Sequence, residues 1–366
     1  MTVLTVVIAP DSFKGTAPAQ NAARAIADGW ASVRPADRLV LLPMADGGEG
    51  TLDAFDTAVP HARRMPVEVQ GPDNQPVASS WLLLPDGTGV VELANTSGLT
   101  LLNPLRPLDA HTLGFGQAIG AALDHGVDRL LLALGGSAST DGGAGAMAAL
   151  GALFVDATNR PIRLGNRGLG TLAKADLTGL RELPAGGAQI LCDVTNPLLG
   201  PNGAAAVFGP QKGATEAQVR GLESNLTRLA RLIRVDPSLP GAGAAGGTAF
   251  GLLAWGATLA PGAAAIGEAL GVPAALAGAS VLITGEGRFD AQSAAGKVPS
   301  YLLQLAADAG VPAMLVAGSI EADTAAFAVA QSLTTIAGSG ALAMADPLRS
   351  LRAAGAALAR EVDSAR

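Results

Sequence analysis

Apolar runs alternate with segments of helical periodicity at both ends of the chain. Thr2–Ala9 is almost continuously apolar and rich in Val, a pattern typical of a strand buried on both faces of a parallel sheet. Helical spacing follows over Ala17–Val33, and Arg38–Pro43 is predicted as a second strand. Near the other end of the chain, Ser280–Thr284 and Ala313–Ala317 are again short and apolar. This alternation predicts β-α-β units around a parallel sheet.

The remaining C-terminal pattern fits the same architecture. The sequence predicts a helix at Ser300–Ala309, a last strand at Leu333–Ile336 and a closing helix near Pro347–Val362. A helix is also expected to begin at Thr51, after the second strand.

The middle of the chain has a different pattern. Val67–Gln70, Ala78–Leu84 and Gly89–Leu93 are predicted as short strands separated by the turn sequences GPDN and PDGTG. Such meanders favour a mixed or antiparallel sheet. Further along, we expect a Gly/Ala helix and two more strands, at Leu113–His125, Arg129–Leu134 and Gln189–Asp193.

These patterns predict an α/β protein of two domains. We expect one domain to be formed by residues 1–65 together with residues 278–366, and a mixed α/β domain of residues 66–277 to be inserted into it.

The composition narrows the function classes. The chain has 366 residues, of which 49% are hydrophobic and 15% charged, so it can bury large cores. Only 3% are aromatic and the net charge is −7; neither base stacking nor a basic face supports binding to nucleic acid. Cys192 is the one cysteine, and His61, His111 and His125 are widely spaced, which excludes a disulfide framework and disfavours a Cys- or His-based metal site.

The sequence also bears on location. The N-terminus lacks a basic segment before its apolar run, and Asp11 interrupts that run, so we expect a strand rather than a signal peptide, and a cytoplasmic protein. No charged residue occurs between Asp236 and Glu268, but this stretch is rich in Gly and Ala and is interrupted by prolines. We therefore expect a buried helix around Gly247–Leu259 and no membrane partner.

Polar, glycine-containing segments follow the predicted strands. They are PDSFKG, MADGGEG, GGSASTDGG, DVTNPLLGPNGA and TGEGRFDAQ. Ligands of open α/β sheets bind beyond the carboxyl ends of the strands, so we expect these segments to form the binding site. Loops are generally rich in Gly and Asp, which would account for one or two such segments but accounts poorly for all of them.

Several of these segments suit phosphate. Gly135–Gly143 (GGSASTDGG) offers hydroxyls and backbone N–H groups ahead of a helix; a tight strand–helix turn is the alternative. Lys212 stands between glycines, where it could contact a phosphate; the alternative is a lysine exposed to solvent in a turn. Lys297 precedes a predicted helix, where a cation is unfavourable and a bound anion would offset its charge. Because Arg greatly outnumbers Lys in this chain, the lysines kept at Lys14, Lys212 and Lys297 indicate a need for a compact ammonium group.

Carboxylates complete the chemical inventory. Asp46 and Glu49 flank a glycine pair, and Asp193 and Asp290 each follow a buried strand. Phosphoryl transfer needs Mg²⁺ held by carboxylates and phosphates, cationic clamps, and often an Asp that accepts the hydroxyl proton. The sequence contains no GxxxxGK[ST] loop, and its GxGxxG match at Gly241–Gly246 does not follow a strand, so a Rossmann dinucleotide site is rejected. The same inventory would suit a dehydratase or a phosphate-binding module.

Taken together, these segments resemble the type-1 glycerate kinase family. The motifs APDSFKGT, PMADGGEGT, LGGSASTDGGAG, DVTNPLLGPNGAAAVFGPQKGA, GAGAAGG and TGEGRFDAQSAAGKVP occur in this order over nearly the whole chain. The resemblance implies a flavodoxin-like parallel three-layer sandwich formed by both chain ends, an inserted mixed α/β domain, and an active site in the cleft between them. It further implies ATP-dependent phosphorylation of D-glycerate with Mg²⁺. The product favoured is 2-phosphoglycerate, in glyoxylate, glycolate or glucarate breakdown, although the residues do not reveal which hydroxyl reacts.

Within such a site we assign roles by chemistry. Asp290 or Asp193 is expected to be the general base, with the other helping to hold Mg²⁺; a helix N-cap or turn is the alternative role for Asp193. Lys14 is expected to neutralise charge during transfer, and Arg288 to grip the glycerate carboxylate through paired hydrogen bonds. The ATP phosphates are assigned to Gly135, Gly136, Ser137, Ser139, Gly142, Gly143, Lys212, Gly285 and Gly287. Glycerate is assigned to Asp11, Ser12, Asp46, Gly47, Gly48, Arg288 and Lys297.

Two alternatives to a glycerate kinase stay open. One is a kinase of the same fold that acts on another small hydroxy acid, and the other is a non-catalytic regulator that binds ATP or a metabolite. The sequence does not determine the nucleotide preference. It does not determine the oligomeric state either, and a homodimer is one of the states that it allows.

Overall fold

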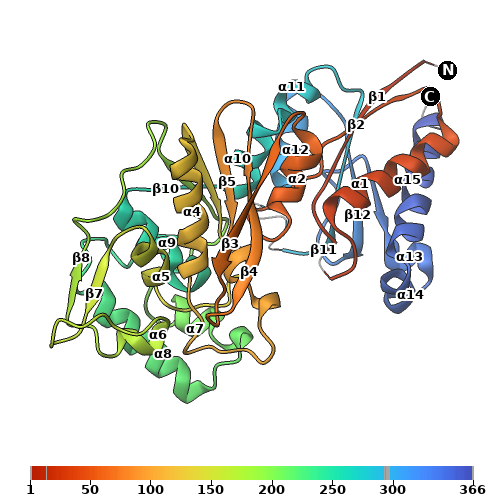
Figure 1. Ribbon diagram of the computed structural model, residues 1–366. Helices are drawn as coiled ribbons and strands as arrows, with labels where there is room; N and C mark the ends of the chain where they lie inside the picture. The colour runs from red at the N-terminus through yellow and green to blue at the C-terminus, as the bar shows by residue number, and fades with distance from the viewer. Residues whose placement is uncertain (1, 14, 292, 294–296, 365–366) are drawn as a thin grey trace. The chain divides into compact units, whose positions relative to one another are not determined.

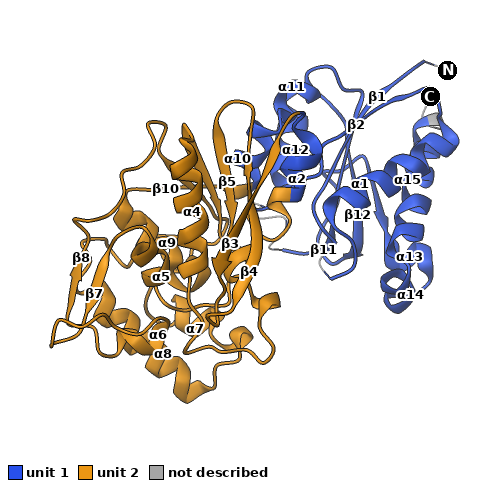
Figure 2. Ribbon diagram, viewed as in Figure 1, with its two compact units in different colours: residues 1–46, 53–60, 263–366 blue, residues 47–52, 61–262 orange. Residues whose placement is uncertain are grey.

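The computed structural model describes residues 2–13, 15–291, 293 and 297–364. It divides into two compact units, coloured separately in Figure 2. Unit 1 comprises residues 1–46, 53–60 and 263–366, and unit 2 comprises residues 47–52 and 61–262. Unit 1 is therefore built from both ends of the chain, and each unit has its own central sheet.

A parallel sheet forms the centre of unit 1 (Figure 1). Its strands are β1 (Thr5–Pro10), β2 (Arg38–Leu41), β11 (Val281–Phe289), β12 (Ala313–Ile320) and β13 (Val329–Ser332). They lie in the order β13-β12-β11-β1-β2, and each neighbouring pair is parallel. Counted along the chain this is the 2-1-3-4-5 order of flavodoxin-like sheets, which confirms the fold class predicted for the chain ends.

Helices cover both faces of this sheet. On one face α1 (Ala19–Val33) and α15 (Pro347–Ser364) lie side by side (Figure 1) and bury Val6 and Ile8 of β1. On the other face α12 (Val298–Asp308) packs against β11 and β12. Because successive strand residues point to opposite faces, burial on both sides explains the nearly continuous apolar run at the N-terminus. The remaining helices that lie wholly or partly in unit 1 are α2 (Thr51–Ala58), α10 (Gly262–Ala269), α11 (Val272–Leu276), α13 (Leu333–Ala337) and α14 (Gly340–Ala345).

A mixed sheet forms the centre of unit 2, as predicted. Its strands are β3 (Arg63–Gln70), β4 (Pro76–Leu83), β5 (Thr88–Glu92), β6 (Arg129–Ala133), β9 (Ala188–Leu191) and β10 (Thr258–Ala260). Their order is β10-β9-β6-β5-β4-β3, with antiparallel pairing of β3 with β4 and of β4 with β5 and parallel pairing elsewhere. A separate antiparallel pair is formed by β7 (Leu153–Val155) and β8 (Lys174–Asp176).

The helices of unit 2 bury a core of their own. Phe115 of α4, Met147 of α5 and Phe250 of α9 belong to one apolar cluster that also contains the buried face of the sheet. The helices are α3 (Ala94–Ser97), α4 (Leu113–His125), α5 (Ala144–Ala149), α6 (Asn166–Leu169), α7 (Ala204–Phe208), α8 (Glu216–Ala230) and α9 (Ala244–Trp255). Short 3₁₀ turns occur at Leu99–Leu101 and Pro210–Lys212.

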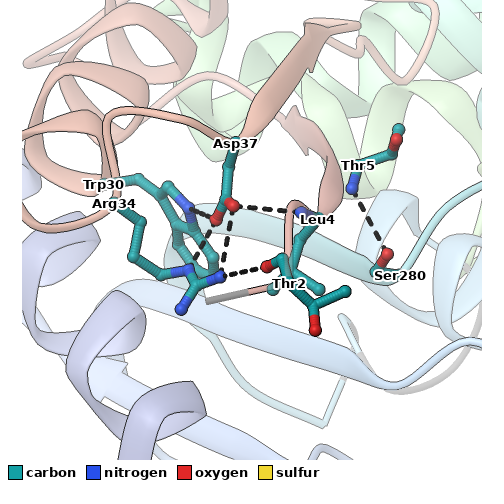
Figure 3. Close-up of polar contacts among 7 residues, drawn as sticks. All are labelled: Thr2, Leu4, Thr5, Trp30, Arg34, Asp37 and Ser280. Atoms are coloured by element: carbon teal, nitrogen blue, oxygen red, sulfur yellow. Dashed lines mark hydrogen bonds and ion pairs between the residues drawn. The ribbon is translucent and has the colours of Figure 1, made fainter.

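A buried polar cluster ties the start of β1 to the end of α1 (Figure 3). The Nε atom of Arg34 lies 2.6 Å from Oδ2 of Asp37, and both side chains are almost fully buried. The Asp37 carboxylate also accepts hydrogen bonds from the indole of Trp30 (2.9 Å) and the backbone N–H of Leu4 (3.0 Å). Burial favours the neutral acid, but these donors together hold the pKa of Asp37 below its usual value. This carboxylate therefore stays ionised inside unit 1.

One secondary-structure prediction in unit 1 is wrong, and another is correct in type but too short. Leu333–Ile336 is helical rather than extended, and the last strand is Val329–Ser332. Leu333 and Ile336 both face the same apolar core, which residues three apart can do on a helix but not on a strand. The strand predicted at Ser280–Thr284 begins one residue later and continues to Phe289, because β12 runs alongside it as far as Ile320.

The helix predicted around Gly247–Leu259 begins and ends earlier than expected. α9 covers Ala244–Trp255, and Leu259 belongs to β10, which pairs with β9. The apolar run therefore crosses a helix end at Gly256, whose φ of 102° is left-handed. In the described parts of the chain, no helix combines the length and the apolar character needed to cross a membrane.

Candidate active site

A cavity of about 480 Å³ lies in unit 1 beyond the carboxyl ends of its strands. Sheets with this strand order bind ligands at the point where the connections diverge, here between β1 and β11. The residues predicted for glycerate and for catalysis that lie in this part of the chain meet there. They are Asp11, Ser12, Asp46, Arg288, Asp290 and Lys297, together with Gly287 from the predicted phosphate set. Segments far apart in the sequence are thus brought to one cavity.

Asp11 lies where β1 meets β11 at this cavity. Its backbone N–H donates to the carbonyl of Gly285 at 2.8 Å, which continues the pairing of the two strands. Its Oδ1 accepts the N–H of Ser12 at 2.6 Å, and the residue is only 6% exposed. The backbone of Asp11 is therefore fixed by β11, and its carboxylate is oriented by the N–H of Ser12.

Arg288 lies between two carboxylates. Its Nε is 3.5 Å from Oδ2 of Asp290, and its Nη2 is 2.5 Å from Oε2 of Glu321. Oδ1 of Asp290 also accepts the N–H of Ser293 at 3.3 Å. The Arg288 side chain is 62% exposed, so these ion pairs are weak. A carboxylate ligand could replace Glu321 on the guanidinium at little cost.

Backbone alone forms part of the cavity wall where β11 and β12 run side by side. Gly287 and Gly318 both line the cavity, and a Cβ atom on Gly318 would overlap the carbonyl group of Gly287. A Cβ atom on Gly285 would likewise overlap the Val316 carbonyl. Close strand approach therefore requires glycine at these positions, and it leaves backbone exposed to a ligand at Gly287.

Lys297 takes the N-cap position of α12 with an extended backbone and lines the cavity. A cation at a helix N-terminus is unfavourable on its own. An anion bound in the cavity would interact with both the ammonium and the helix dipole, as the sequence suggested.

Four polar residues of the cavity were not predicted from the sequence: Thr16, Glu286, Ser319 and Thr334. Glu286 is 7% exposed and belongs to β11. It stood inside the quoted TGEGRFDAQ segment but was not singled out, because that segment was expected to be a loop. Thr334 lies on α13, which was expected to be a strand.

The carboxylates of the cavity suit Mg²⁺ bound together with phosphate. Asp11, Asp46, Glu286 and Asp290 line the same space, and oxygen ligands are the ones that Mg²⁺ prefers. Among the described residues, no group of three or more acidic, His or Cys side chains is close enough to hold a metal by itself. Mg²⁺ usually takes one or two carboxylates and completes its shell with phosphate oxygens and water, so this donor set fits that mode.

In unit 2, the segment Gly135–Gly143 connects β6 to α5 and is held by Asp141. Oδ2 of Asp141 accepts the backbone N–H and the hydroxyl of Thr112 at 3.0 and 2.9 Å, and the N–H of Gly145 at 3.1 Å. Gly142 and Gly143 have φ values of 65° and 76°, which favour glycine. Asp141 is fully buried; it was part of the quoted motif but was assigned no role.

Lys212 contacts the same segment. Its Nζ donates to Oγ of Ser137 at 3.2 Å and to the carbonyl oxygen of Ser139, and the residue is 2% exposed. Burial lowers the pKa of Lys212 to about 7, against the attraction of the Asp141 carboxylate. The alternative of a solvated turn lysine is therefore wrong.

The Gly135–Gly143 segment, which Lys212 contacts, also contains buried hydroxyl groups. Within the described residues, Ser139 Oγ and Thr140 Oγ1 are buried and make no hydrogen bond. A Cβ atom on Gly246 would lie 2.9 Å from the Lys212 Nζ, so the GAGAAGG segment closes over the amine. Unpaired buried hydroxyls are rare in native structures and are often found where a ligand or water binds.

Gly47 and Gly48 pack against the ends of strands in unit 2. The N–H of Gly135 donates to the carbonyl of Gly47 at 3.1 Å, and a Cβ atom on Gly135 would overlap Gly48. Glu92, at the end of β5, accepts the N–H groups of Gly50 (3.2 Å) and Leu52 (3.0 Å) at the start of α2. The glycine pair is thus needed for close packing as well as for any contact with glycerate.

Asp193 lies after β9 in unit 2. Its Oδ1 accepts the N–H of Gly262, the first residue of α10, at 2.7 Å. This contact matches the structural alternative considered for Asp193. Lys14 lies outside the described residues, so its predicted role stays a prediction.

Comparison with known proteins places the chain in a family. The model of the glycerate kinase family matches residues 6–363. Glycerate 2-kinase of Escherichia coli K12 is 40% identical over 352 residues, covering 91% of this chain and 92% of that protein. Glycerate kinase of Halalkalibacterium halodurans is 41% identical over 326 residues, covering 86% of each chain. The crystal structure of a putative glycerate kinase 2 from Salmonella typhimurium LT2 covers 100% of this chain and 99% of its own with a TM-score of 0.86, at 38% identity.

The fold, the cavity and these likenesses define an enzyme of the phosphotransferase class. Within that class, the chain belongs to the glycerate kinase family. The resemblance found in the sequence motifs is thereby confirmed.

Proposed function

We propose that this enzyme transfers the terminal phosphate of ATP to D-glycerate and forms 2-phosphoglycerate. The observation that carries the proposal is the cavity of unit 1, where a carboxylate-rich lining meets the cations Arg288 and Lys297. Phosphoryl transfer depends on positioning and charge stabilisation rather than on covalent help from the protein, and this lining supplies both. The name of the Escherichia coli relative, glycerate 2-kinase, supports the 2-hydroxyl as acceptor.

Asp290 is the residue we assign as general base. It lines the cavity and is partly exposed, at 30%, so a substrate hydroxyl can reach it. Arg288, 3.5 Å from Asp290, would bind the glycerate carboxylate and so bring the hydroxyl to the base. Asp193 has a structural contact, which favours Asp290 over Asp193 for proton transfer.

Mg²⁺ would be held by cavity carboxylates other than the base, with Asp11 as the candidate that lies where β1 meets β11. When bound, the ion would neutralise charge on the phosphates of ATP. The protein's own part is to orient the glycerate hydroxyl, to receive its proton at a carboxylate oxygen, and to exclude water.

The segment Gly135–Gly143 and Lys212 are proposed to contact the ATP phosphates from unit 2. Support comes from the buried amine, the hydroxyls of Ser139 and Thr140, and the left-handed glycines beside them. The cleft between two domains that the sequence resemblance implies stays a prediction.

A coupled assay of ADP formation tests the proposal. The enzyme is mixed with ATP, Mg²⁺ and D-glycerate, and with tartronate or another hydroxy acid in parallel. ADP formation that depends on D-glycerate is expected. Turnover only with another hydroxy acid would point to a different kinase, and ATP binding without turnover of any hydroxy acid would point to a regulator.

A further inference from the structure

The cavity of unit 1 has two kinds of lining. Carboxylates and cations come from β11 and from the segments after β1, β2 and β11, whereas the apolar side chains other than Phe13, which follows β1, come from the helices after β13. These apolar residues, which we call the apolar wall, are Leu333 of α13, Ala343 and Met344 of α14, and Pro347 of α15. In the sheet order β13-β12-β11-β1-β2, the wall belongs to the β12–β13 side and Asp11 and Asp46 to the β1–β2 side.

Glycerate alone does not account for this cavity. It is a three-carbon hydroxy acid with polar groups on every carbon, and it offers nothing for an apolar wall to bind. The volume of about 480 Å³ falls in the range of roughly 300–1,000 Å³ that is usual for larger organic ligands. A ligand with one apolar, ring-like part and one anionic part that carries Mg²⁺ matches both linings.

The surface between the two linings suits a flat ring. Gly287 and Gly318 line the cavity where β11 and β12 lie side by side, and neither carries a side chain. Beside them the hydroxyl of Thr334 donates to the carbonyl of Gly318 at 2.8 Å. Its lone pairs are then oriented to accept a hydrogen bond from an amino group, such as the exocyclic amine of adenine.

We propose that the apolar wall binds the adenine ring of ATP, with the phosphate chain directed past Lys297 and with Arg288 left to the glycerate carboxylate. The inference rests on the proposed function, since it names where the nucleotide of that reaction is held. This inference assigns recognition of the adenine base to α13 and α14. Neither helix has a catalytic or phosphate-binding role in the proposed function.

Helix α14 provides a matched pair of residues for the test. Met344 is 63% exposed and Leu342 is 60% exposed, yet of these two only Met344 lines the cavity. Met344→Asp puts a charge against the proposed ring site, and Leu342→Asp puts the same charge on the same helix away from it. We expect Met344→Asp to raise the KM for ATP about tenfold or more with the KM for D-glycerate unchanged. Leu342→Asp should leave both constants at the wild-type values.

Gly340→Val provides a second variant, which fills the proposed ring site with an apolar side chain instead of introducing a charge. A Cβ atom at Gly340 meets Thr334 Oγ1 at 3.8 Å, which is ordinary contact, so the backbone accommodates the change. It should also raise the KM for ATP and not the KM for glycerate. If both cavity variants keep the wild-type KM for ATP, or raise only the KM for glycerate, the inference is overturned.

Saturation-transfer NMR with adenosine separates this inference from the proposed reaction. The wild-type enzyme should transfer saturation to the adenine protons, Leu342→Asp should do the same, and Met344→Asp should lose the signal. This outcome would support the ring site even if no hydroxy acid were phosphorylated. Absence of adenosine binding by the wild type, or equal binding by all variants, would overturn it even if glycerate kinase activity were established.

Discussion

The Nζ atom of Lys212 lies 3.2 Å from the Oγ atom of Ser137, and both residues are almost entirely buried. Burial of an ammonium group is unfavourable, so the pKa of Lys212 falls from 10.5 to about 7. A buried cation that weakens its own fold in this way is common at functional sites and uncommon elsewhere. The contact thus links the Gly135–Gly143 segment to a group that an anionic ligand would stabilise.

Lys212→Met should change how stability depends on pH. Between about pH 7 and about pH 10.5, the unfolded wild type holds a proton that the folded state has lost, so its free energy of unfolding rises with pH. The full increase in the free energy of unfolding is reached above the pKa that Lys212 has in the unfolded state. It is lost as the pH falls to the pKa that Lys212 has in the folded state. Urea unfolding at about pH 7.5 and about pH 9.5 should show the wild type gaining roughly 2 kcal/mol relative to Lys212→Met.

Lys174→Met is the matched control for that experiment. Lys174 is exposed and donates to Asn159 Oδ1 at 2.9 Å, so its removal should leave the pH dependence of stability unchanged. If Lys212→Met follows the wild type in parallel across the same pH range, the lowered pKa is wrong. Activity with D-glycerate should be lost in Lys212→Met and kept in Lys174→Met.

Asp290→Asn should lower kcat for D-glycerate phosphorylation by about a hundredfold or more, because an amide cannot accept the hydroxyl proton. Its KM values should change less, since the amide keeps the shape of the side chain. Asp308→Asn serves as the control. Asp308 is an exposed residue of α12 whose Oδ1 accepts a hydrogen bond from the side chain of Gln304 at 2.8 Å. Near-normal turnover by Asp290→Asn would remove this residue from the role of base.

Glu321→Gln should lower the KM for D-glycerate. Glu321 and a glycerate carboxylate would compete for Arg288, and the Glu321 contact at 2.5 Å is largely exposed. Such pairs contribute up to about 1 kcal/mol, so the expected change is up to about fivefold. Arg288→Ala should raise the same constant, and the KM for ATP should stay constant in both variants. An unchanged KM for glycerate in Arg288→Ala would show that this guanidinium does not bind the substrate.

Asp37→Asn should destabilise the fold without affecting the chemistry. The variant removes the negative charge that is paired with the buried Arg34 guanidinium (Figure 3), and breaking such a buried pair costs about 3–5 kcal/mol. Asp28→Asn removes an exposed ion pair with Arg352 and should cost less than about 1 kcal/mol. Urea unfolding followed by tryptophan fluorescence compares the two, and equal losses would contradict the account of the buried cluster.

The same cluster predicts a sensitivity to acid. The donors around Asp37 keep its pKa below the usual 3.8, so its contribution to stability is present above that value. It is lost as the pH falls through the lower pKa of the folded state. Asp37→Asn should therefore show a shallower loss of stability in strong acid than the wild type.

Much of the cavity could be predicted because parallel strands end at one edge of a sheet. Asp11, Asp46 and Asp290 each follow a strand of unit 1, and all of them line the same cavity. A continuous apolar strand followed by a polar, glycine-rich segment is readable from sequence, and the order of the strands need not be known for their ends to converge.

Other residues could not be predicted because tertiary packing overrides local pattern. Glu286 follows a glycine that suggested a loop, yet β11 continues through it because β12 lies alongside. Leu333 and Ile336 have strand-like neighbours, but a shared core holds them on one helix face. The buried state of Lys212 depends on Gly246, which lies in a distant segment and cannot be inferred from the turn around the lysine.

The position of the new phosphate group tests the central claim most directly. Wild-type enzyme is incubated with ATP, Mg²⁺ and D-glycerate, and the product is examined by phosphorus NMR with proton coupling. We predict an ester signal split into a doublet by the single proton on C2, formed only when ATP is present. A triplet from the two protons on C3 would contradict the assignment of 2-phosphoglycerate, and the absence of any ester signal would contradict glycerate kinase activity itself.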